Sequence, residues 1–219
     1  MSDFVCEIPR DHERPRIIER VAIFGFADAP EESDLYKEAF AVAKAVAECG
    51  YTVVNGGGPG VMKAATEGAK SGGGKVIGVT FKPKETTGFE GKDPQNKVDK
   101  EIETSNYLER TLKLLQIGQV YVVFDGGTGT LSEFGMAWGL AKLYFGHHKP
   151  LILYGHFWHE IIETIRKHMY LRQADLEVFK IANSPHEVLM EITAFGKEIA
   201  EGKHVHLAVT GNGEEAFTI

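Results

Sequence analysis

The feature that most constrains the fold is a strand, a glycine turn and a helix start in direct succession over residues 120–133. An apolar, β-branched run is followed by Asp125 and a glycine-rich turn, and a helix is expected to begin at Thr130. The first N–H groups of a helix have no partner within it, and its dipole is positive there, so such a junction binds anions. Glycines let the backbone approach a ligand closely. The pattern predicts a phosphate site one turn before Glu133, formed by Gly126, Gly127, Thr128, Gly129 and Thr130.

Strand-like and helix-like segments alternate along the chain. Strands are expected at Arg20–Phe26, Tyr51–Asn55, Lys75–Phe81, Val120–Phe124, Pro150–Tyr154 and Val178–Ile181, and helices at Ser33–Cys49, Gly60–Ser71, Thr104–Ile117, Thr130–Phe145, Trp158–Met169 and Pro185–Glu201. Apolar strands separated by helices indicate a parallel sheet that helices cover on both faces. Right-handed crossovers then predict a Rossmann-like, doubly wound α/β fold whose ligands bind beyond the carboxyl ends of the strands.

The length of 219 residues is typical of one α/β domain, which we expect over residues 20–201. Residues 1–19 and 202–219 are interpreted as N- and C-terminal tails. The polar, turn-rich segment 82–99 is expected to form a mobile excursion near the ligand-binding edge of the sheet.

Composition excludes several classes of partner. A net charge of −7 argues against binding to nucleic acid polymers, which requires a basic surface. No apolar run is long enough to cross a bilayer, and the N-terminal residues lack the apolar core of a signal peptide. Two cysteines, Cys6 and Cys49, fit a reducing compartment and form neither a disulfide framework nor a metal site. We therefore expect a cytoplasmic protein without a membrane partner.

Two other glycine-rich segments lack the residues that would define known cofactor motifs. The segment 56–60 follows the second expected strand, and the strand after it ends without the acid that would hold a ribose diol, which argues against a nicotinamide enzyme. Lys75 follows a glycine run but is succeeded by Val76, so the Walker phosphate loop is absent. The segment 56–60 is either a tight turn between packed elements or part of a ligand cleft.

Histidines do not form a convincing metal site in the sequence. His156 and His159 lie at the start of an expected helix, and His147 and His148 lie in a loop. No cysteine cluster or carboxylate pair accompanies them at ligand spacing, so we predict no metal.

These motifs resemble the LONELY GUY family of nucleoside-monophosphate phosphoribohydrolases, many members of which are mislabelled as lysine decarboxylases. The resemblance runs from about residue 21 to 195 and rests on the glycine run 56–60 with Met62, on Arg110, and on the Gly-Gly-x-Gly-Thr-x-x-Glu pattern that ends at Glu133. It implies a Rossmann-like homodimer, or a larger homo-oligomer, that cleaves the N-glycosidic bond of a nucleoside 5′-monophosphate without a cofactor.

The resemblance also implies roles for individual residues. Arg110 and Glu133 would be catalytic, the glycine–threonine loop would hold the 5′-phosphate, and Gly25, Gly57 and Gly58 would complete the nucleotide site. The helix after the loop would contribute to the dimer interface. Three departures from the family pattern put the substrate in question: Asp125 replaces a proline, Thr111 stands where a lysine is common, and the segment 25–28 lacks the usual serine-rich stretch.

The residues support this chemistry independently of the family. The helix that carries Arg110 precedes the strand of residues 120–124, so its N-terminal half lies at the carboxyl edge of the sheet, within reach of Glu133. Cleavage of a ribosyl bond passes through an oxocarbenium-like state, which a carboxylate stabilises. Two alternatives stay open: Thr130 and Glu133 also match a capping box, and Arg110 could be a solvated helix residue.

Two functions follow from the sequence. The first is hydrolysis of AMP or a related purine nucleotide. The second is a non-enzymatic carrier of a nucleotide or of the molybdenum cofactor on the same scaffold, which resembles the molybdenum-cofactor carrier proteins.

Overall fold

The structure is a computed structural model that describes residues 17–82, 92–143 and 150–200. Strands and helices alternate along these residues in the order β1 (Arg20–Phe24), α1 (Asp34–Glu48), β2 (Thr52–Asn55), α2 (Val61–Ser71), β3 (Val76–Phe81), β4 (Lys100–Thr104), α3 (Tyr107–Ile117), β5 (Val120–Val123), α4 (Thr128–Leu143), β6 (Leu151–Tyr154), α5 (Phe157–His168), α6 (Gln173–Leu176), β7 (Phe179–Ala182) and α7 (Pro185–Ala200).

All strands of the described residues belong to one parallel sheet with the order β4-β3-β2-β1-β5-β6-β7. The chain builds the sheet from β1 toward β4 and then returns to the other side of β1 with β5. The border between β1 and β5 is therefore the topological switch point, where ligands of doubly wound folds bind. The predicted Rossmann-like α/β fold is confirmed.

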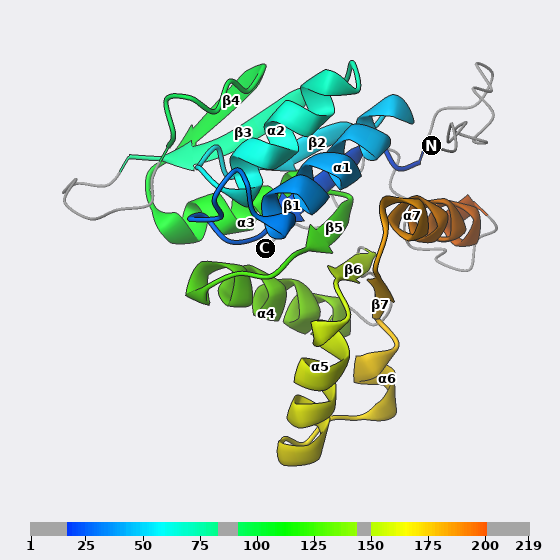
Figure 1. Cartoon of the computed structure of the whole chain (residues 1–219). Helices are drawn as coiled ribbons and strands as arrows, with labels where there is room; N and C mark the ends of the chain where they lie inside the picture. The colour runs from blue at the N-terminus through cyan, green and yellow to red at the C-terminus, as the bar shows by residue number, and fades with distance from the viewer. Residues whose placement is uncertain (1–16, 83–91, 144–149, 201–219) are drawn as a thin grey trace.

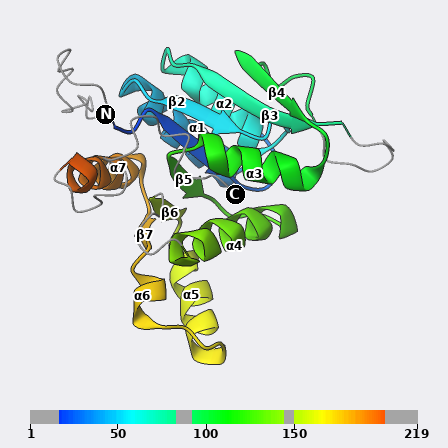
Figure 2. The same ribbon diagram turned by 180° about the vertical axis from the view of Figure 1, so that it is seen from behind.

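Helices cover both faces of this sheet, and each face has its own core. Figure 1 shows α1 and α2 in front of the strands, whereas Figure 2, seen from behind, shows α3 in that place. Alternate residues of β1 point to opposite cores: Val21 and Ile23 pack with α1, α2 and α7, while Ala22 and Phe24 pack with α3, α4 and α5. Burial on both faces is why the central strands are apolar throughout.

The helix starts agree with their local sequence. Ser33 is the N-cap of α1 and accepts a hydrogen bond from the Tyr36 N–H at 3.2 Å. Asn106 caps α3 in the same way, through the Glu109 N–H at 2.9 Å. These side chains satisfy N–H groups that have no partner within the helix.

The structure corrects several sequence-based boundaries. Strand β4 was not expected, because its residues are charged and largely exposed at the edge of the sheet, and its sequence lacks the apolar signal of the central strands. Its presence moves the start of α3 from Thr104 to Tyr107. The short helix α6 was also missed. Helix α4 begins at Thr128, two residues before the expected Thr130, so the glycine turn is shorter than predicted.

Much of the excursion expected over residues 82–99 lies outside the described residues. Within the described part, residues 92–98 are called the strap below. It packs against the turn after β2, and Asn96 is buried there with 6% of its surface exposed. The strap therefore belongs to the folded body of the protein.

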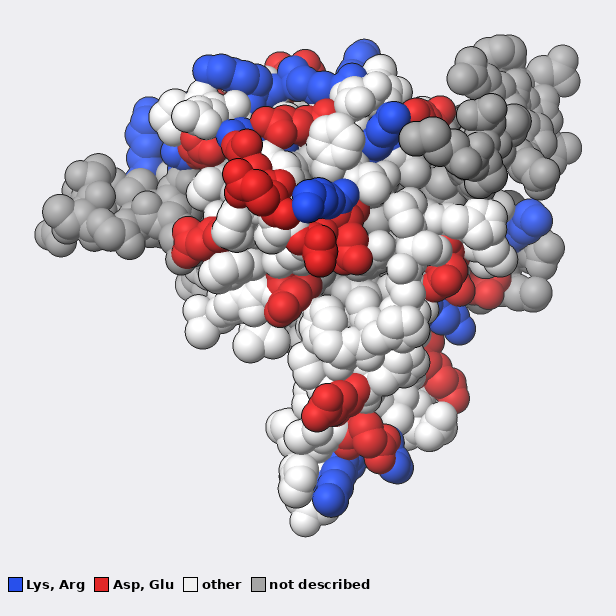
Figure 3. All heavy atoms as spheres, viewed as in Figure 1, with Lys and Arg blue, Asp and Glu red and all other residues white. Residues whose placement is uncertain are grey.

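Three further observations bear on the compositional expectations. None of the described helices is long and apolar enough to span a membrane. Figure 3 shows acidic side chains grouped over α1 and α2 on the face seen in Figure 1. Cys49, the C-cap residue of α1, is disulfide-bonded, which contradicts the expectation that the cysteines are reduced. The expected domain limits stay predictions.

Candidate active site

A cleft with a volume of about 170 Å³ opens at the carboxyl ends of β1 and β5. Its walls come from residues 23–27 at the end of β1, from Gly56 and Met62 around the turn between β2 and α2, from Phe81, Lys92, Tyr107 and Arg110, and from residues 127–130 with Glu133 at the start of α4. Segments distant in the sequence thus meet at the switch point of the sheet.

The first turn of α4 forms one wall of this cleft. The Gly127 carbonyl accepts the first helical hydrogen bond, from the Leu131 N–H at 3.0 Å. Gly127, Thr128 and Gly129 are exposed, and the first N–H groups of a helix have no partner within it. Gly126 does not line the cleft, because it packs on the buried Thr130, whose hydroxyl would collide with a Cβ at position 126. The wall is therefore an exposed helix N-terminus suited to an anion.

Arg110 and Glu133 meet at the floor of the cleft. The Arg110 Nη1 lies 3.3 Å from the Glu133 Oε1, and the two side chains are only 12% and 8% exposed. The Arg110 Nε donates to the Val79 carbonyl at 3.2 Å, and its Nη2 faces the Met62 sulfur at 3.5 Å. The ring of Tyr107 lies 5.9 Å from the guanidinium carbon. This arginine is thus held in one orientation from several sides.

The structure decides between the alternatives that the sequence left open. A capping box would need Thr130 as the N-cap of α4, but Thr130 lies inside the helix, and Glu133 pairs with Arg110 instead. Arg110 is not a solvated helix residue, because its side chain is buried against Glu133 and the end of β3. The two residues that the sequence predicted to act together are therefore in contact.

Burial changes the chemistry of this carboxyl group. Loss of water raises the pKa of Glu133 from 4.5 to about 7, and the positive charge of Arg110 opposes this rise. A carboxyl group that titrates near neutral pH inside a cleft is typical of sites that bind or transfer protons.

The glycines of the predicted site have different positions. Gly25 lines the cleft and packs against Val61, whose Cγ1 would lie 2.6 Å from a Cβ at position 25. Gly57 and Gly58 are not among the lining residues. The Gly57 N–H donates to Asn55 at 2.8 Å, and the Gly58 carbonyl accepts from Asn96 at 2.7 Å.

Gly56 lines the cleft in place of these two glycines, which answers for one residue the question that the sequence left open for the segment 56–60. A Cβ at position 56 would collide with the Arg110 Nη2, so only glycine leaves room for the guanidinium. Its position as the first residue after the second strand, at the carboxyl edge of the sheet, could have identified it from the sequence. Tyr107 was also missed, although it lies three residues before Arg110 on the same helix face.

Two of the departures from the expected family pattern have a clear position. Asp125 is exposed, and its backbone carbonyl accepts the Phe26 N–H at 2.9 Å, which joins the loops after β1 and β5. Thr111 is fully buried in α3 and does not line the cleft. Its hydroxyl has no hydrogen-bond partner among the described residues.

No group of three or more histidine, cysteine or acidic side chains that could hold a metal occurs in the part of the chain that the structure describes. The rings of His156 and His159 lie 6.4 Å apart at the start of α5. His147 and His148 are outside the described residues.

The fold and the cleft define a Rossmann-like α/β protein with a ligand cleft at its topological switch point. Residues 19–189 match the model of the SLOG cluster4 family (LDcluster4), and the chain belongs to this family. The predicted resemblance to the LONELY GUY proteins is confirmed by the relatives that follow.

Two relatives in sequence show how far the similarity extends. A protein of Mycobacterium tuberculosis named cytokinin riboside 5′-monophosphate phosphoribohydrolase is 34% identical over 136 residues, which are 60% of this chain and 70% of that protein. An uncharacterized protein of Archaeoglobus fulgidus is 28% identical over 136 residues, covering 62% of this chain and 84% of that one.

The fold recurs in solved structures. The molybdenum cofactor binding protein of Rippkaea orientalis superposes with a TM-score of 0.60 at 24% identity, covering 81% of this chain and 97% of that protein. At this identity the likeness concerns the fold alone.

Replacement of Glu133 by glutamine is expected to stabilise the protein at pH 8. Because the folded-state pKa is raised from 4.5 to about 7, the cost of burying the charge is absent below pH 4.5, grows between these values, and is complete above pH 7. That interval corresponds to about 3 kcal/mol with the attraction to Arg110 already included, and burial of the new glutamine amide offsets part of it. Urea unfolding should show Glu133→Gln to be more stable than the parent by about 1–2 kcal/mol at pH 8, and by less at pH 5.

Glu38→Gln, the same change at an exposed position of α1, is the matched control and should alter the free energy of unfolding little at either pH. A Glu133→Gln variant that is less stable at pH 8 than at pH 5, relative to the parent, would contradict the assignment of a buried charge.

Replacement of Gly56 by alanine is expected to move Arg110 away from Glu133, because the new methyl group would occupy the position of the Arg110 Nη2. The pKa of Glu133 should then rise above about 7, since a charge that lowers it has been displaced. Carbon-13 NMR titration of the glutamate carboxyl measures this shift. Gly139→Ala in α4, where a Cβ meets no atom within 4 Å, should leave the pKa unchanged. Equal titration curves for both variants would refute the role of Gly56.

Proposed function

We propose that this protein hydrolyses the N-glycosidic bond of a nucleoside 5′-monophosphate, AMP or a related purine nucleotide, to a free base and ribose 5-phosphate. The observation that carries the proposal is the buried pair of Arg110 and Glu133 beside the exposed N-terminus of α4. The name of the Mycobacterium tuberculosis relative, a phosphoribohydrolase, supports the same reaction class.

The phosphate would bind at the first turn of α4. The exposed backbone at Gly127, Thr128 and Gly129 offers N–H donors together with the positive end of the helix dipole. A monoester held there directs its sugar toward the floor of the cleft, where Arg110 and Glu133 lie. Phe81 and Tyr107, whose rings are 6.1 Å apart, provide an aromatic wall on which a base could stack.

The reaction breaks the bond between C1′ and the base nitrogen. The base leaves with the bonding electron pair, a water oxygen forms the new bond to C1′, and the proton that this water gives up balances the proton that the base takes up. Positive charge develops on the sugar as the base departs, and the ionised form of Glu133 stabilises it at short range in a site of low dielectric. Arg110 keeps a fraction of Glu133 ionised near neutral pH and offers further donors to the phosphate or the base. No step requires a cofactor.

A homodimer is proposed from the family resemblance. Helices α3 and α4 carry exposed apolar side chains that such an interface could cover, namely Leu108 at 64%, Leu112 at 36% and Leu131 at 51% exposure. A cytoplasmic location remains a prediction from composition.

A carrier of a nucleotide or of the molybdenum cofactor is the second candidate. Asp125 favours it, because an exposed carboxylate adjoins the glycine turn where the family pattern has a proline. Incubation of the purified protein with nucleoside monophosphates separates the two functions, since a carrier retains its ligand without releasing a base.

The purified protein is expected to release free base and ribose 5-phosphate from AMP. Glu133→Gln should lower kcat by at least about 100-fold, because it removes the charge that stabilises the transition state, and should leave nucleotide binding intact. Chromatography of free base from a panel of nucleoside monophosphates measures turnover, and calorimetry measures binding. Undiminished turnover in the variant would remove Glu133 from the mechanism.

Replacement of Gly127 by alanine is expected to weaken phosphate binding without destabilising the fold. A Cβ at this position meets no protein atom within 4 Å and projects from a residue that lines the cleft. The affinity for AMP should fall about tenfold or more, which calorimetry on the Glu133→Gln background measures without turnover. Gly135→Ala on the same helix also meets open space, but it lies outside the cleft and should preserve affinity. Equal affinities in both variants would place the phosphate elsewhere.

A further inference from the structure

A network of buried polar groups lies behind Arg110, at the turn that follows β2. Asn55, the last residue of β2, is fully buried and uses both ends of its amide. Its Oδ1 accepts the Gly57 N–H at 2.8 Å, and its Nδ2 donates to the Met62 carbonyl at 3.1 Å and to the Thr66 hydroxyl at 2.9 Å. One side chain therefore fastens the turn onto the first residues of α2.

The turn and the start of α2, which Asn55 holds together, are both in contact with the Arg110 guanidinium. Gly56 lies so close to the guanidinium that a Cβ there would overlap the Nη2, and the Met62 sulfur is 3.5 Å from the same nitrogen. A movement of either residue therefore changes the space that the guanidinium occupies.

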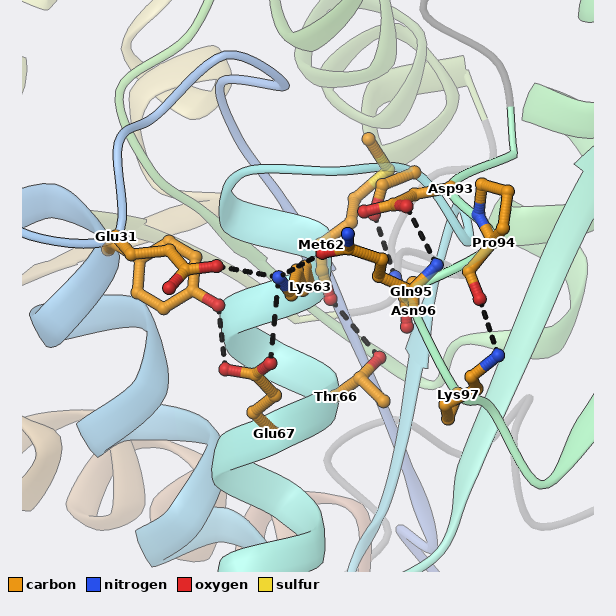
Figure 4. Close-up of polar contacts among 12 residues, drawn as sticks. Glu31, Met62, Lys63, Thr66, Glu67, Asp93, Pro94, Gln95, Asn96 and Lys97 are labelled. Carbon is orange, nitrogen blue, oxygen red and sulfur yellow. Dashed lines mark hydrogen bonds and ion pairs between the residues drawn. The ribbon is translucent and has the colours of Figure 1, made fainter.

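The strap holds the turn from the other side. The Asn96 Nδ2 donates to the Gly58 carbonyl at 2.7 Å, and the Asp93 N–H donates to the Gly57 carbonyl at 3.0 Å. Figure 4 shows how the strap is itself held, because the Lys63 ammonium bridges Gln95 of the strap and Glu31 of the loop after β1.

We propose that Asn55 is a positioning residue for Arg110, and that Asn96 of the strap supports the same turn from the opposite side. The inference deepens the proposed function and rests on it for the catalytic consequence alone. Neither asparagine lines the cleft, so both would act through the turn of residues 56–58.

The direction of the change in the Glu133 pKa separates positioning from general loosening. If loss of Asn55 displaces Arg110, the charge effect that lowers the pKa of Glu133 weakens and that pKa rises. If loss of Asn55 merely opens the site to water, burial is relieved and the pKa falls toward 4.5. The two explanations thus predict opposite signs for one measured quantity.

The test compares Asn55→Ala with Thr66→Val in the full chain. Asn55→Ala removes the acceptor of the Gly57 N–H, whereas Thr66→Val removes one partner of the Asn55 amide and leaves the bond to Gly57 in place. We expect NMR titration to show a raised Glu133 pKa in Asn55→Ala and an unchanged one in Thr66→Val. We also expect kcat for nucleotide hydrolysis to fall about 10- to 100-fold in Asn55→Ala, as for a small misplacement of a catalytic group.

A double-mutant cycle gives the second readout. The loss of kcat caused by Asn55→Ala should largely vanish in an Arg110→Ala background, because the residue that it positions is absent there. An additive loss, or a Glu133 pKa that falls in Asn55→Ala, would overturn the proposal.

Failure of the proposed function and failure of the positioning proposal give different results. If no nucleotide is hydrolysed, the proposed function fails, while the NMR titration still tests the positioning of Arg110. If Asn55→Ala does not fold, Asn96→Ala replaces it, with the same expected rise of the Glu133 pKa, and an unchanged or lowered pKa in that variant would refute the proposal.

Discussion

The buried contact between Arg110 and Glu133 is the interaction on which the interpretation of this protein depends. Two ionisable side chains from α3 and α4 lie 3.3 Å apart with little access to water. Burial of charge is costly, and a pair of well-packed apolar residues would generally stabilise a fold at least as well. The pKa of about 7 for Glu133 reflects that cost, because the pairing with Arg110 offsets the loss of hydration only in part. Such an arrangement is characteristic of a site under functional constraint.

The topology of the sheet determines where this contact forms. Between β1 and β5 the chain reverses the direction in which it adds strands, so the loops that follow these two strands diverge and leave a cleft. The start of α4 and Arg110 on α3 both reach this edge of the sheet. Gly25, Gly56 and Gly126 then allow neighbouring segments to approach more closely than a side chain would permit. The site is thus a consequence of the doubly wound fold and of glycine at these three positions.

Much of this organisation could be predicted from the sequence, and the exceptions have physical reasons. The parallel sheet was predictable because central strands buried on both faces are apolar throughout. Strand β4 was not, since an edge strand with charged residues lacks that signal. Glu133 as a helix cap was a fair alternative from local sequence, because a capping box requires only two residues at the right spacing. It proved wrong because α4 begins two residues earlier and Arg110 provides a better partner.

The sequence by itself determined the fold class, the glycine turn before α4 and the two residues expected to act together, since these follow from local patterns of polarity, glycine and charge. Only the tertiary structure decided that Gly56, and neither Gly57 nor Gly58, adjoins the arginine, and that Asn55 and Asn96 fasten the turn between them. The contact between Asn96 and Gly58 joins residues 38 apart in the sequence, and Gly56 and Arg110 are farther apart still. Local sequence does not predict contacts between residues so far apart in the chain, because these contacts form only when helices and strands pack on one sheet.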